Sequence, residues 1–367
     1  MEMFFVAGIG LAAFIEFLLV TKKNKSVPDK VLTLWMFIVT VQLFLFYLFL
    51  SGNFQNVPFL LGVERPLPLL HGVMLYFYVS FFTNQAPNNR KLLLLHIVPA
   101  SLMYLYLIRF FILPPEQKIW VYTHRGAGYE LFEVIHHYAI AVSGVCYVIW
   151  SSLLLRKHRA AVRDQFSNLE RVNLRWLQIL TYGMGFIWFV IVFVKEDTFV
   201  LAAAVLFVFL IGFFGVRQME IFVGRPGNKE GEEEEREKYQ KSGLTEEASA
   251  ELHRSLIRIM SEQGLYKESD LSINDLASKL NVHPNYLSQV INQKEQKNFY
   301  DFVNGYRVDE FKRLIADRKN EQFTLLALAH DCGFSSKTSF NRCFKKATGQ
   351  TPSEYAASLA PQNTDTP

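Results

Sequence analysis

Seven long runs of apolar residues, separated by short polar stretches, make up most of the first 217 residues of the chain. The runs cover approximately residues 3–21, 30–50, 67–83, 92–113, 132–155, 176–194 and 198–216. A helix needs about 20 apolar residues to cross the roughly 30 Å hydrocarbon core of a bilayer, and each run is close to that length. The pattern therefore predicts a seven-helix transmembrane bundle over residues 1–217.

A polar and acidic stretch follows the last apolar run. Gly, Pro and a series of Glu over residues 224–243 predict a solvated spacer, and we place a charged linker at residues 218–250. Helical periodicity then returns with Leu252, Leu256 and Ile259. That helix could pair with a second copy of the chain or cap the following domain. We favour the cap, because the apolar run is shorter than the three to four heptads of a coiled coil.

Residues 272–292 show the pattern of two short helices joined by a tight turn. Ser272 and Asp275 form a capping box that begins the first helix, and Asn281 suits the left-handed conformation of such a turn. Pro284 suits the first position of the second helix. The apolar residues of this second helix face inward, which leaves outward Asn285, Ser288, Gln289 and Asn292. The arrangement is typical of a helix-turn-helix unit.

A second unit of the same kind follows about fifty residues later. Residues 325–332 predict its first helix, Gly333 ends that helix, and Ser335 or Ser336 caps the next one. The outer face of this next helix carries Lys337, Thr338, Asn341, Arg342 and Lys345. Between the units, residues 299–319 predict one long helix that holds them in fixed relation. The fold predicted for the whole chain is all-α, with a domain of two helix-turn-helix units at residues 251–359 and a disordered tail at residues 360–367.

Charge and composition add an orientation to this picture. Lys and Arg number twelve in one set of loops between the apolar runs and four in the opposite set. Under the positive-inside rule, the N-terminus lies outside and the C-terminal part lies in the cytoplasm. The three Cys are widely spaced, fit neither a disulfide framework nor a zinc motif, and predict buried reduced thiols. Phosphate-binding loops and catalytic motifs are absent from the apolar half, so we expect no enzyme activity, metal or cofactor.

Ionisable residues within the apolar runs are candidates for a ligand site, because placing them in a bilayer is costly. Those near the predicted outer ends of their helices are His71, Arg109, Glu133, His136 and His137, and Glu64, Arg65, His124 and Glu130 lie in adjacent loops. Glu133 and His137 are four residues apart and share one helix face. One hypothesis is a ligand pocket at the outer face. The other is that these side chains extend to the membrane surface or pair structurally. A metal site has less support, because neighbouring His residues on one helix diverge.

Several short motifs in the last hundred residues occur together in one known family. They are residues 273–277, 286–288, 299–304, 306–307, 333–346 and 349–355. With these motifs, residues from about 252 to 358 resemble the DNA-binding domain of AraC/XylS-type transcription regulators, and the whole arrangement is similar to membrane-bound regulators of that family. The resemblance implies seven short helices, two recognition helices in successive major grooves of DNA, and a place in the bacterial cytoplasmic membrane.

The residue types on the two outer helix faces suit this role. Asn and Gln pair bidentately with adenine and Arg with guanine, whereas Lys and hydroxyl groups contact phosphates. We expect base contacts from Asn285, Ser288, Gln289, Thr338, Asn341 and Arg342, and phosphate contacts from Ser336, Lys337, Lys345 and Lys346. The first helix-turn-helix unit departs from the family pattern, because its recognition helix has no basic residue until Lys294 and the usual Gly after that helix is replaced within residues 294–297.

We therefore expect a membrane-embedded one-component transcription regulator with a sensing membrane domain. Its expected partners are double-stranded DNA, the lipid bilayer and an unidentified small-molecule or envelope signal, and a second copy of the chain is a further candidate. Coupling between the halves could use a shift in oligomeric pairing or release from the membrane face. Two alternatives remain open from the sequence: a transporter or membrane enzyme with an attached regulator, and a passive membrane tether.

Overall fold

The computed structural model describes residues 2–124, 126–169, 174–194, 197–218 and 245–359. Within these ranges all regular secondary structure is helical, apart from one isolated β-bridge between Phe166 and Ser272. The chain forms two compact units: unit 1 comprises Met1–Lys157 and Leu174–Pro226, and unit 2 comprises His158–Asn173 and Gly227–Pro367. The all-α prediction is confirmed. The acidic linker and the C-terminal tail expected from the sequence lie largely outside the described residues.

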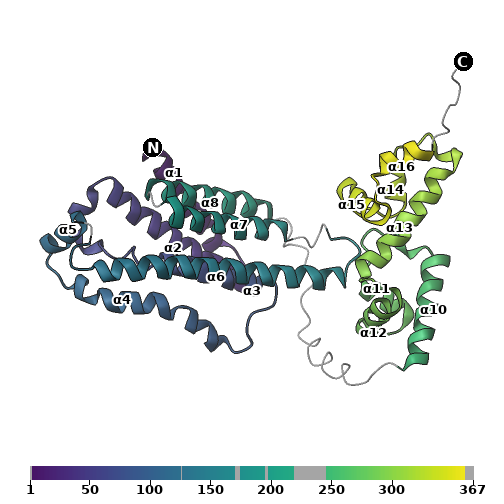
Figure 1. Cartoon of the computed structure of the whole chain (residues 1–367), viewed down its shortest axis with the longest axis horizontal. Coiled ribbons are helices and arrows are strands. Elements are labelled where there is room, and N and C mark those ends of the chain that lie inside the picture. Colours follow the sequence, from purple (N-terminus) through teal and green to yellow (C-terminus); the bar gives the residue numbers. More distant parts are fainter. Residues whose placement is uncertain (1, 125, 170–173, 195–196, 219–244, 360–367) are drawn as a thin grey trace, which may run out of the picture. The chain divides into compact units, whose positions relative to one another are not determined.

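Unit 1 consists of apolar helices that follow the seven apolar runs (Figure 1). They are α1 (Glu2–Thr21), α2 (Val27–Leu50), α3 (Pro68–Phe82), α4 (Val98–Phe111), α5 (Pro115–Thr123), α6 (Glu130–Arg163), α7 (Arg175–Phe189) and α8 (Asp197–Gln218). Short 3-10 turns cover Asn53–Asn56, Pro58–Leu60 and Arg90–His96, and a π-helical turn Val190–Val194 extends α7. Every apolar run is therefore helical, as predicted.

The number of helices that could cross a membrane is smaller than seven by length and composition. Four have the length and apolar character to span a bilayer, and a fifth results if α4 and α5, bent by 117°, are counted as one span. The apolar helix α3 and the apolar stretch Thr198–Phe214 of α8 are shorter. The seven-span count therefore remains a prediction.

The core of unit 1 forms where α1 packs against α2 and α8, α2 against α3, and α7 against α8. Trp35 and Met36 are fully buried in it. Gly144 of α6 lies directly against the indole ring of Trp188 from α7, where a Cβ would come within 2.1 Å of the ring. A small residue is required there because α6 and α7 approach each other closely, as small residues commonly allow between membrane helices.

One prediction about the thiols is wrong. Cys332 and Cys343 are buried, but Cys146 is exposed on α6. Its apolar neighbours Val142, Val145 and Ile149 are exposed as well. This face of α6 does not pack against the other helices, so the apolar character of the sequence around Cys146 did not indicate burial in a protein core.

Unit 2 holds the elements expected of two helix-turn-helix units (Figure 1). They are α10 (Glu246–Glu262), α11 (Ile273–Leu280), α12 (Pro284–Val290), α13 (Phe299–Ala316), α14 (Leu325–Asp331), α15 (Lys337–Thr348) and α16 (Pro352–Leu359), with 3-10 turns at Leu265–Lys267 and Arg318–Asn320 and a π-helical turn at Ile291–Glu295. Helix α10 begins five residues before the predicted domain start at residue 251. Its buried Leu252, Leu256 and Ile259 join the core of the first helix-turn-helix unit, so the helix caps the domain as we favoured.

Unit 2 contains two separate apolar cores that share α13. The first core combines α10, α11 and α12 with Phe299, Phe302 and Val303 from α13. The second combines α14 and α15 with Tyr300, Val308 and Phe311 from the same helix. The predicted long helix therefore connects the two units through its own side chains, since residues on its different faces enter different cores.

Gln296 offers a test of backbone strain at the end of the first helix-turn-helix unit. It takes the left-handed conformation at φ 53° and ψ 33°, after the π-helical turn and at the place where the resemblance implies Gly. This conformation costs a residue with a Cβ about 1–2 kcal/mol. Glycine avoids this cost, but it loses more backbone entropy on folding, which offsets part of the gain. We therefore expect Gln296→Gly to raise the free energy of unfolding of unit 2 by about 0.5–1 kcal/mol. Native-state hydrogen exchange of unit 2 in the full chain measures the change.

Asn281→Gly is the matched control for this prediction. Asn281 also has a positive φ, of 52°, at the end of α11. Asn tolerates the left-handed region better than Gln, so its replacement should stabilise the unit less. A gain at Asn281 that equals or exceeds the gain at Gln296 would show that the conformation of Gln296 stores no additional strain.

Candidate functional site

Unit 1 contains a pocket of about 350 Å³ between its helices. Apolar side chains from α2, α7 and α8 supply much of its lining. The polar side chains in the lining are Gln42, Glu64, Arg65, His71, Tyr122, Glu133, His136 and His137. The structure thus brings together four of the five candidates from the sequence. The fifth, Arg109, is exposed on α4 and is not among the lining residues.

Arg65, in the loop before α3, organises much of this polar lining. Its guanidinium group donates to Glu133 Oε2 at 3.0 Å and lies 3.6 Å from Glu64 Oε1. The hydroxyl of Tyr122 donates to the same oxygen of Glu64. His136 Nε2 donates to the backbone carbonyl of Arg65 at 2.5 Å. The two carboxylates and one guanidinium are linked to one another, so this part of the lining is a fixed network.

His71 is held in one protonation state by its neighbours. The indole Nε1–H of Trp35 is a donor only, and it lies 3.2 Å from His71 Nδ1, which therefore accepts. In the neutral ring the proton then lies on Nε2, which donates to Gln42 Oε1 at 2.6 Å. Gln42 was not singled out from the sequence, although an amide within an apolar run was a visible signal.

Two lining groups keep hydrogen-bonding capacity for a ligand. Trp188 is 3% exposed, and its Nε1–H has no hydrogen-bond partner among the residues that the structure describes. His137 has only a ring contact with Tyr138 among the interactions of the described residues. A buried unpaired donor is costly unless something accepts from it. The described residues hold no group of three or more His, Cys, Asp or Glu placed to bind a metal ion.

The first recognition helix, α12, is positioned by local sequence signals that act as predicted. Ser272 accepts from the Asp275 amide in a complete capping box, and Asn281 takes the left-handed turn conformation at φ 52°. His283 then caps α12 by accepting from the Asn285 amide, with Pro284 at the first helical position. Leu287, Val290 and the following Ile291 are buried in the first core, whereas Asn285 and Gln289 are exposed and Ser288 is half-buried. The polar face therefore points away from the core.

The second recognition helix, α15, presents a positively charged face. Gly333 has a φ of 93° and lies so close to the carbonyls of Tyr266 and Lys267 that no Cβ fits there. Ser336 then caps α15 by accepting from the Ser339 amide. Phe340 and Phe344 enter the second core. The predicted contact residues Lys337, Thr338, Asn341, Arg342, Lys345 and Lys346 are all exposed.

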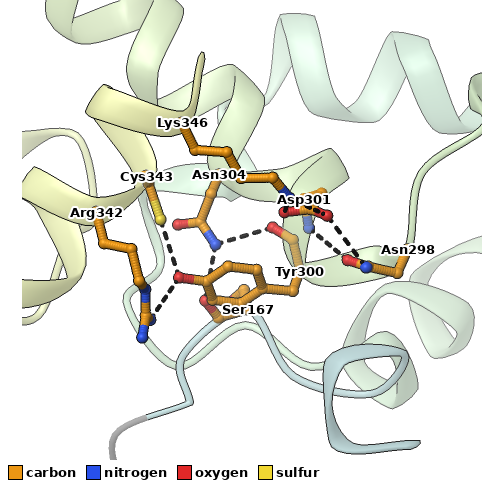
Figure 2. Close-up of polar contacts among 8 residues, drawn as sticks. All are labelled: Ser167, Asn298, Tyr300, Asp301, Asn304, Arg342, Cys343 and Lys346. Carbon is orange, nitrogen blue, oxygen red and sulfur yellow. Dashed lines mark hydrogen bonds and ion pairs between the residues drawn. The ribbon is translucent and has the colours of Figure 1, made fainter. Parts of the chain in front are cut away.

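Two of these cations are linked to α13 (Figure 2). Arg342 donates to the hydroxyl of Tyr300 at 2.9 Å, and that hydroxyl also contacts Cys343 Sγ at 2.9 Å. Lys346 Nζ lies 2.7 Å from both carboxylate oxygens of Asp301. The side chains that we expect to contact DNA are therefore oriented by the helix that carries both cores.

The first unit offers fewer positive charges, as the sequence indicated. Lys294, the first basic residue after the start of α12, forms an ion pair with Glu246 of α10. A second ion pair joins His253 to Glu295 at 2.7 Å. Of the two predicted recognition helices, α15 therefore carries the greater positive charge.

Known proteins resemble unit 2 in sequence. Residues 276–358 match a family model described as a helix-turn-helix domain. The HTH-type transcriptional regulator YijO of Escherichia coli is 31% identical over 99 residues, which are 27% of this chain and 34% of YijO. The Msm operon regulatory protein of Streptococcus mutans is 25% identical over 87 residues, 24% of this chain and 30% of that protein. A solved structure of a Listeria innocua protein of unknown function is 27% identical, covers 28% of this chain and 93% of that one, and has a TM-score of 0.25.

Unit 2 therefore contains a helix-turn-helix domain over residues 276–358. The matches to YijO and the Msm regulator agree with the capped helices and the outward polar faces of unit 2. The chain spans about a third of the length of these two curated relatives. DNA-binding regulation is therefore supported for the helix-turn-helix domain.

Proposed function

We propose that this protein is a membrane-embedded transcription regulator in which a ligand bound in unit 1 controls sequence-specific DNA binding by the helix-turn-helix domain. The domain lies on the cytoplasmic side of the membrane in this proposal. Both recognition helices read bases, through Asn285, Ser288 and Gln289 of α12 and through Thr338, Asn341 and Arg342 of α15. The phosphate contacts come from Ser336, Lys337, Lys345 and Lys346.

The surface of unit 1 supports a place in the membrane. Large apolar side chains on several helices are exposed, among them Phe14, Phe17, Phe37 and Phe213. Water-soluble proteins rarely expose so many in contiguous patches, whereas lipid is a suitable solvent for them. The four long apolar helices and the excess of Lys and Arg in one set of loops agree with this reading.

The observation that carries the sensing proposal is the pocket in unit 1. Its volume of about 350 Å³ falls within the range of small-molecule sites, roughly 300–1,000 Å³. Its lining combines a mostly apolar wall with a few convergent polar groups, which is typical of such sites. The unpaired indole donor of Trp188 calls for a ligand atom that accepts a hydrogen bond. A small amphipathic molecule with such an acceptor fits this lining.

Replacement of His137 tests whether the pocket receives the signal. His137 lines the pocket, and the described residues form no hydrogen bond with it, so His137→Phe removes a ligand contact without breaking the Arg65 network. A lost hydrogen bond of about 1 kcal/mol corresponds to about fivefold weaker binding. We expect the signal concentration needed for half-maximal response of a reporter gene to rise by about that factor. The reporter is placed under a promoter that the full chain controls.

His124→Phe is the control for this experiment. His124 is exposed, stacks on Trp120 at the end of α5, and does not line the pocket. We expect its replacement to leave the response unchanged. If both variants respond as the unaltered chain does, unit 1 serves as a passive tether and the sensing proposal fails.

A further inference from the structure

The loop that follows α6 is an integral part of unit 2. Ser167 is 1% exposed and Asn168 is 7% exposed, and their hydrogen-bond partners Leu271 and Asp270 lie more than a hundred residues further along the chain. Helix α6 begins in unit 1, and its last residues together with this loop belong to unit 2. We refer to residues 165–169 as the docking segment.

Backbone pairing fixes the docking segment beside the start of the first helix-turn-helix unit. Phe166 and Ser272 form an antiparallel bridge, flanked by hydrogen bonds from the Ser167 amide to Leu271 O at 3.1 Å and from the Ile273 amide to Gln165 O at 2.9 Å. The Ser167 hydroxyl donates to Leu271 O at 2.6 Å. The segment thus pairs with the residues that immediately precede α11.

Side chains of α13 hold the same segment from the other side. Asn304 Nδ2 donates to Ser167 O at 3.0 Å and to Tyr300 O at 2.8 Å (Figure 2). Arg307 Nη2 donates to the Ser167 hydroxyl at 3.2 Å. At the end of the segment, Leu169 packs against the second apolar core. The segment therefore contacts the start of the first unit, the shared helix and the core of the second unit.

We propose that the docking segment is an internal binding partner of the helix-turn-helix domain. The segment holds the two helix-turn-helix units of this domain in the relative orientation that reads two half-sites of DNA together. The recognition residues Asn285, Gln289 and Asn341 stay exposed while the segment is docked. Docking therefore organises the DNA-reading surface and leaves it open. Without the segment, α13 is the main connection between the two cores.

The same segment gives unit 1 a covalent route to the DNA-binding domain. Helix α6 has 34 residues and is about 50 Å long at 1.5 Å per residue. Its first turns carry the pocket residues Glu133, His136 and His137, and only Asp164 separates its last residue from the docking segment. A rotation or shift of α6 on ligand binding would pull directly on Ser167. The inference goes beyond the proposed function, although it rests on the proposed reading of DNA by both units.

An engineered disulfide measures docking in the full chain without DNA. The flanking hydrogen bonds make Phe166 and Ser272 a non-hydrogen-bonded pair, whose Cα atoms in antiparallel strands are about 4.5 Å apart. That separation is within the range of disulfides. We expect Phe166→Cys with Ser272→Cys to cross-link under mild oxidation, while the unaltered chain under the same oxidant does not. Failure of the pair to cross-link would overturn the proposal before any DNA is added.

A buried and an exposed position then receive the same new side chain. Ser167→Leu puts a bulky apolar group where the hydroxyl joins Leu271 O to Arg307, and it adds no charge. Gln165→Leu is the matched control, because the Gln165 side chain is exposed and only its carbonyl takes part in docking. We expect Ser167→Leu to abolish most of the cross-linking in the double-Cys background, and Gln165→Leu to leave it unchanged.

DNA binding of the same variants gives the functional result. The probes are a duplex selected from a random pool by the full chain, and the same duplex with the half read by α15 scrambled. We expect Ser167→Leu to weaken binding of the intact duplex by about fivefold to tenfold, as for a typical coupling between sites, and to leave binding of the scrambled duplex unchanged. Gln165→Leu should change neither.

The outcomes separate this inference from the proposed function. Equal losses of affinity for both duplexes would mean that Ser167 supports the folding of the first helix-turn-helix unit. No loss of affinity for either duplex would mean that the docking segment is a passive loop. Both results overturn the inference. If the unaltered chain shows no preference between the intact and the scrambled duplex, the proposed reading by two units fails, while the cross-linking result still decides whether the segment docks.

Discussion

Arg307→Ala should lower the free energy of unfolding of unit 2 by about 3–5 kcal/mol, which is the usual cost of removing one partner from a buried charged network. Arg307 is 1% exposed. Its five N–H groups lie within hydrogen-bonding distance of six acceptors, which are Tyr266 O, Glu268 O, Ser269 O, Ser167 O, Ser167 Oγ and Asn304 Oδ1. Removing the side chain takes this donor from each acceptor. Ser167 O and Glu268 O keep other donors, from Asn304 Nδ2 and the Leu271 amide, but buried acceptors left without a donor are costly.

The position of Arg307 explains why the effect should spread through the unit. Its acceptors include the carbonyls that precede α11, and its guanidinium carbon lies 5.9 Å from the centre of the Phe334 ring in the second core. Burial lowers the pKa of Arg307 to about 10, so the group still carries its charge at neutral pH. Lys has three donors on a single nitrogen, so Arg307→Lys should recover little of the stability.

Native-state hydrogen exchange of α13 and of the residues around Leu271 measures this loss in the full chain. Arg313→Ala, on the same helix, is the control. Arg313 is exposed and pairs at 2.8 Å with the buried Glu310, which also pairs with Lys267 at 2.9 Å and so keeps a cation when Arg313 is replaced. If Arg307→Ala and Arg313→Ala reduce protection equally, the buried network does not stabilise unit 2 in the way that its geometry suggests.

Arg342→Ala should reduce the preference for the selected duplex over unrelated DNA by about 1–3 kcal/mol, or about fivefold to 150-fold, because a bidentate contact to guanine carries that much discrimination. Lys345 is exposed on the same helix and is proposed to contact a phosphate. Lys345→Ala should weaken binding to all duplexes alike and reduce the salt dependence by about one counterion. Titrations of both duplexes at several salt concentrations separate the two effects.

Tyr300→Phe controls for the internal contact of Arg342. The variant removes the hydroxyl that receives the hydrogen bond from Arg342, but it keeps the ring in the second core. We expect a small change in DNA preference. An equal loss of preference from Arg342→Ala and Tyr300→Phe would mean that Arg342 positions α15 and does not read a base. An equal loss from Arg342→Ala and Lys345→Ala would reject the assigned roles.

Local sequence signals predicted the helix-turn-helix domain well, because its turns and caps depend on neighbouring residues. The Ser272 capping box, the left-handed Asn281 and the Gly333 turn all lie where the spacing of residue types placed them. The apolar runs likewise predicted the helices of unit 1. The apolar runs did not predict the number of membrane spans equally well, because α3 is short and α4 bends into α5.

Contacts between distant parts of the chain were beyond such signals. The contact of Gln42 with His71 joins residues 29 positions apart, and the contact of Ser167 with Arg307 joins residues 140 positions apart. The unpaired donor of Trp188 depends on how whole helices pack. Periodicity identifies which face of a helix is apolar, but it does not identify the partner of that face. For the same reason the exposed face around Cys146 resembled a buried one.

The ion pair between Lys346 and Asp301 gives the protein an internal counter-ion. A free Lys on the recognition helix would hold mobile cations away and attract any polyanion, whereas Lys346 is already neutralised by a carboxylate 2.7 Å away. Binding to a phosphate must break this pair, so less of the affinity for arbitrary DNA comes from Lys346 than its charge implies. A regulator confined to the membrane samples only the DNA that approaches it. If the protein acts as proposed, weak attraction to unrelated sequences leaves it available for its own site.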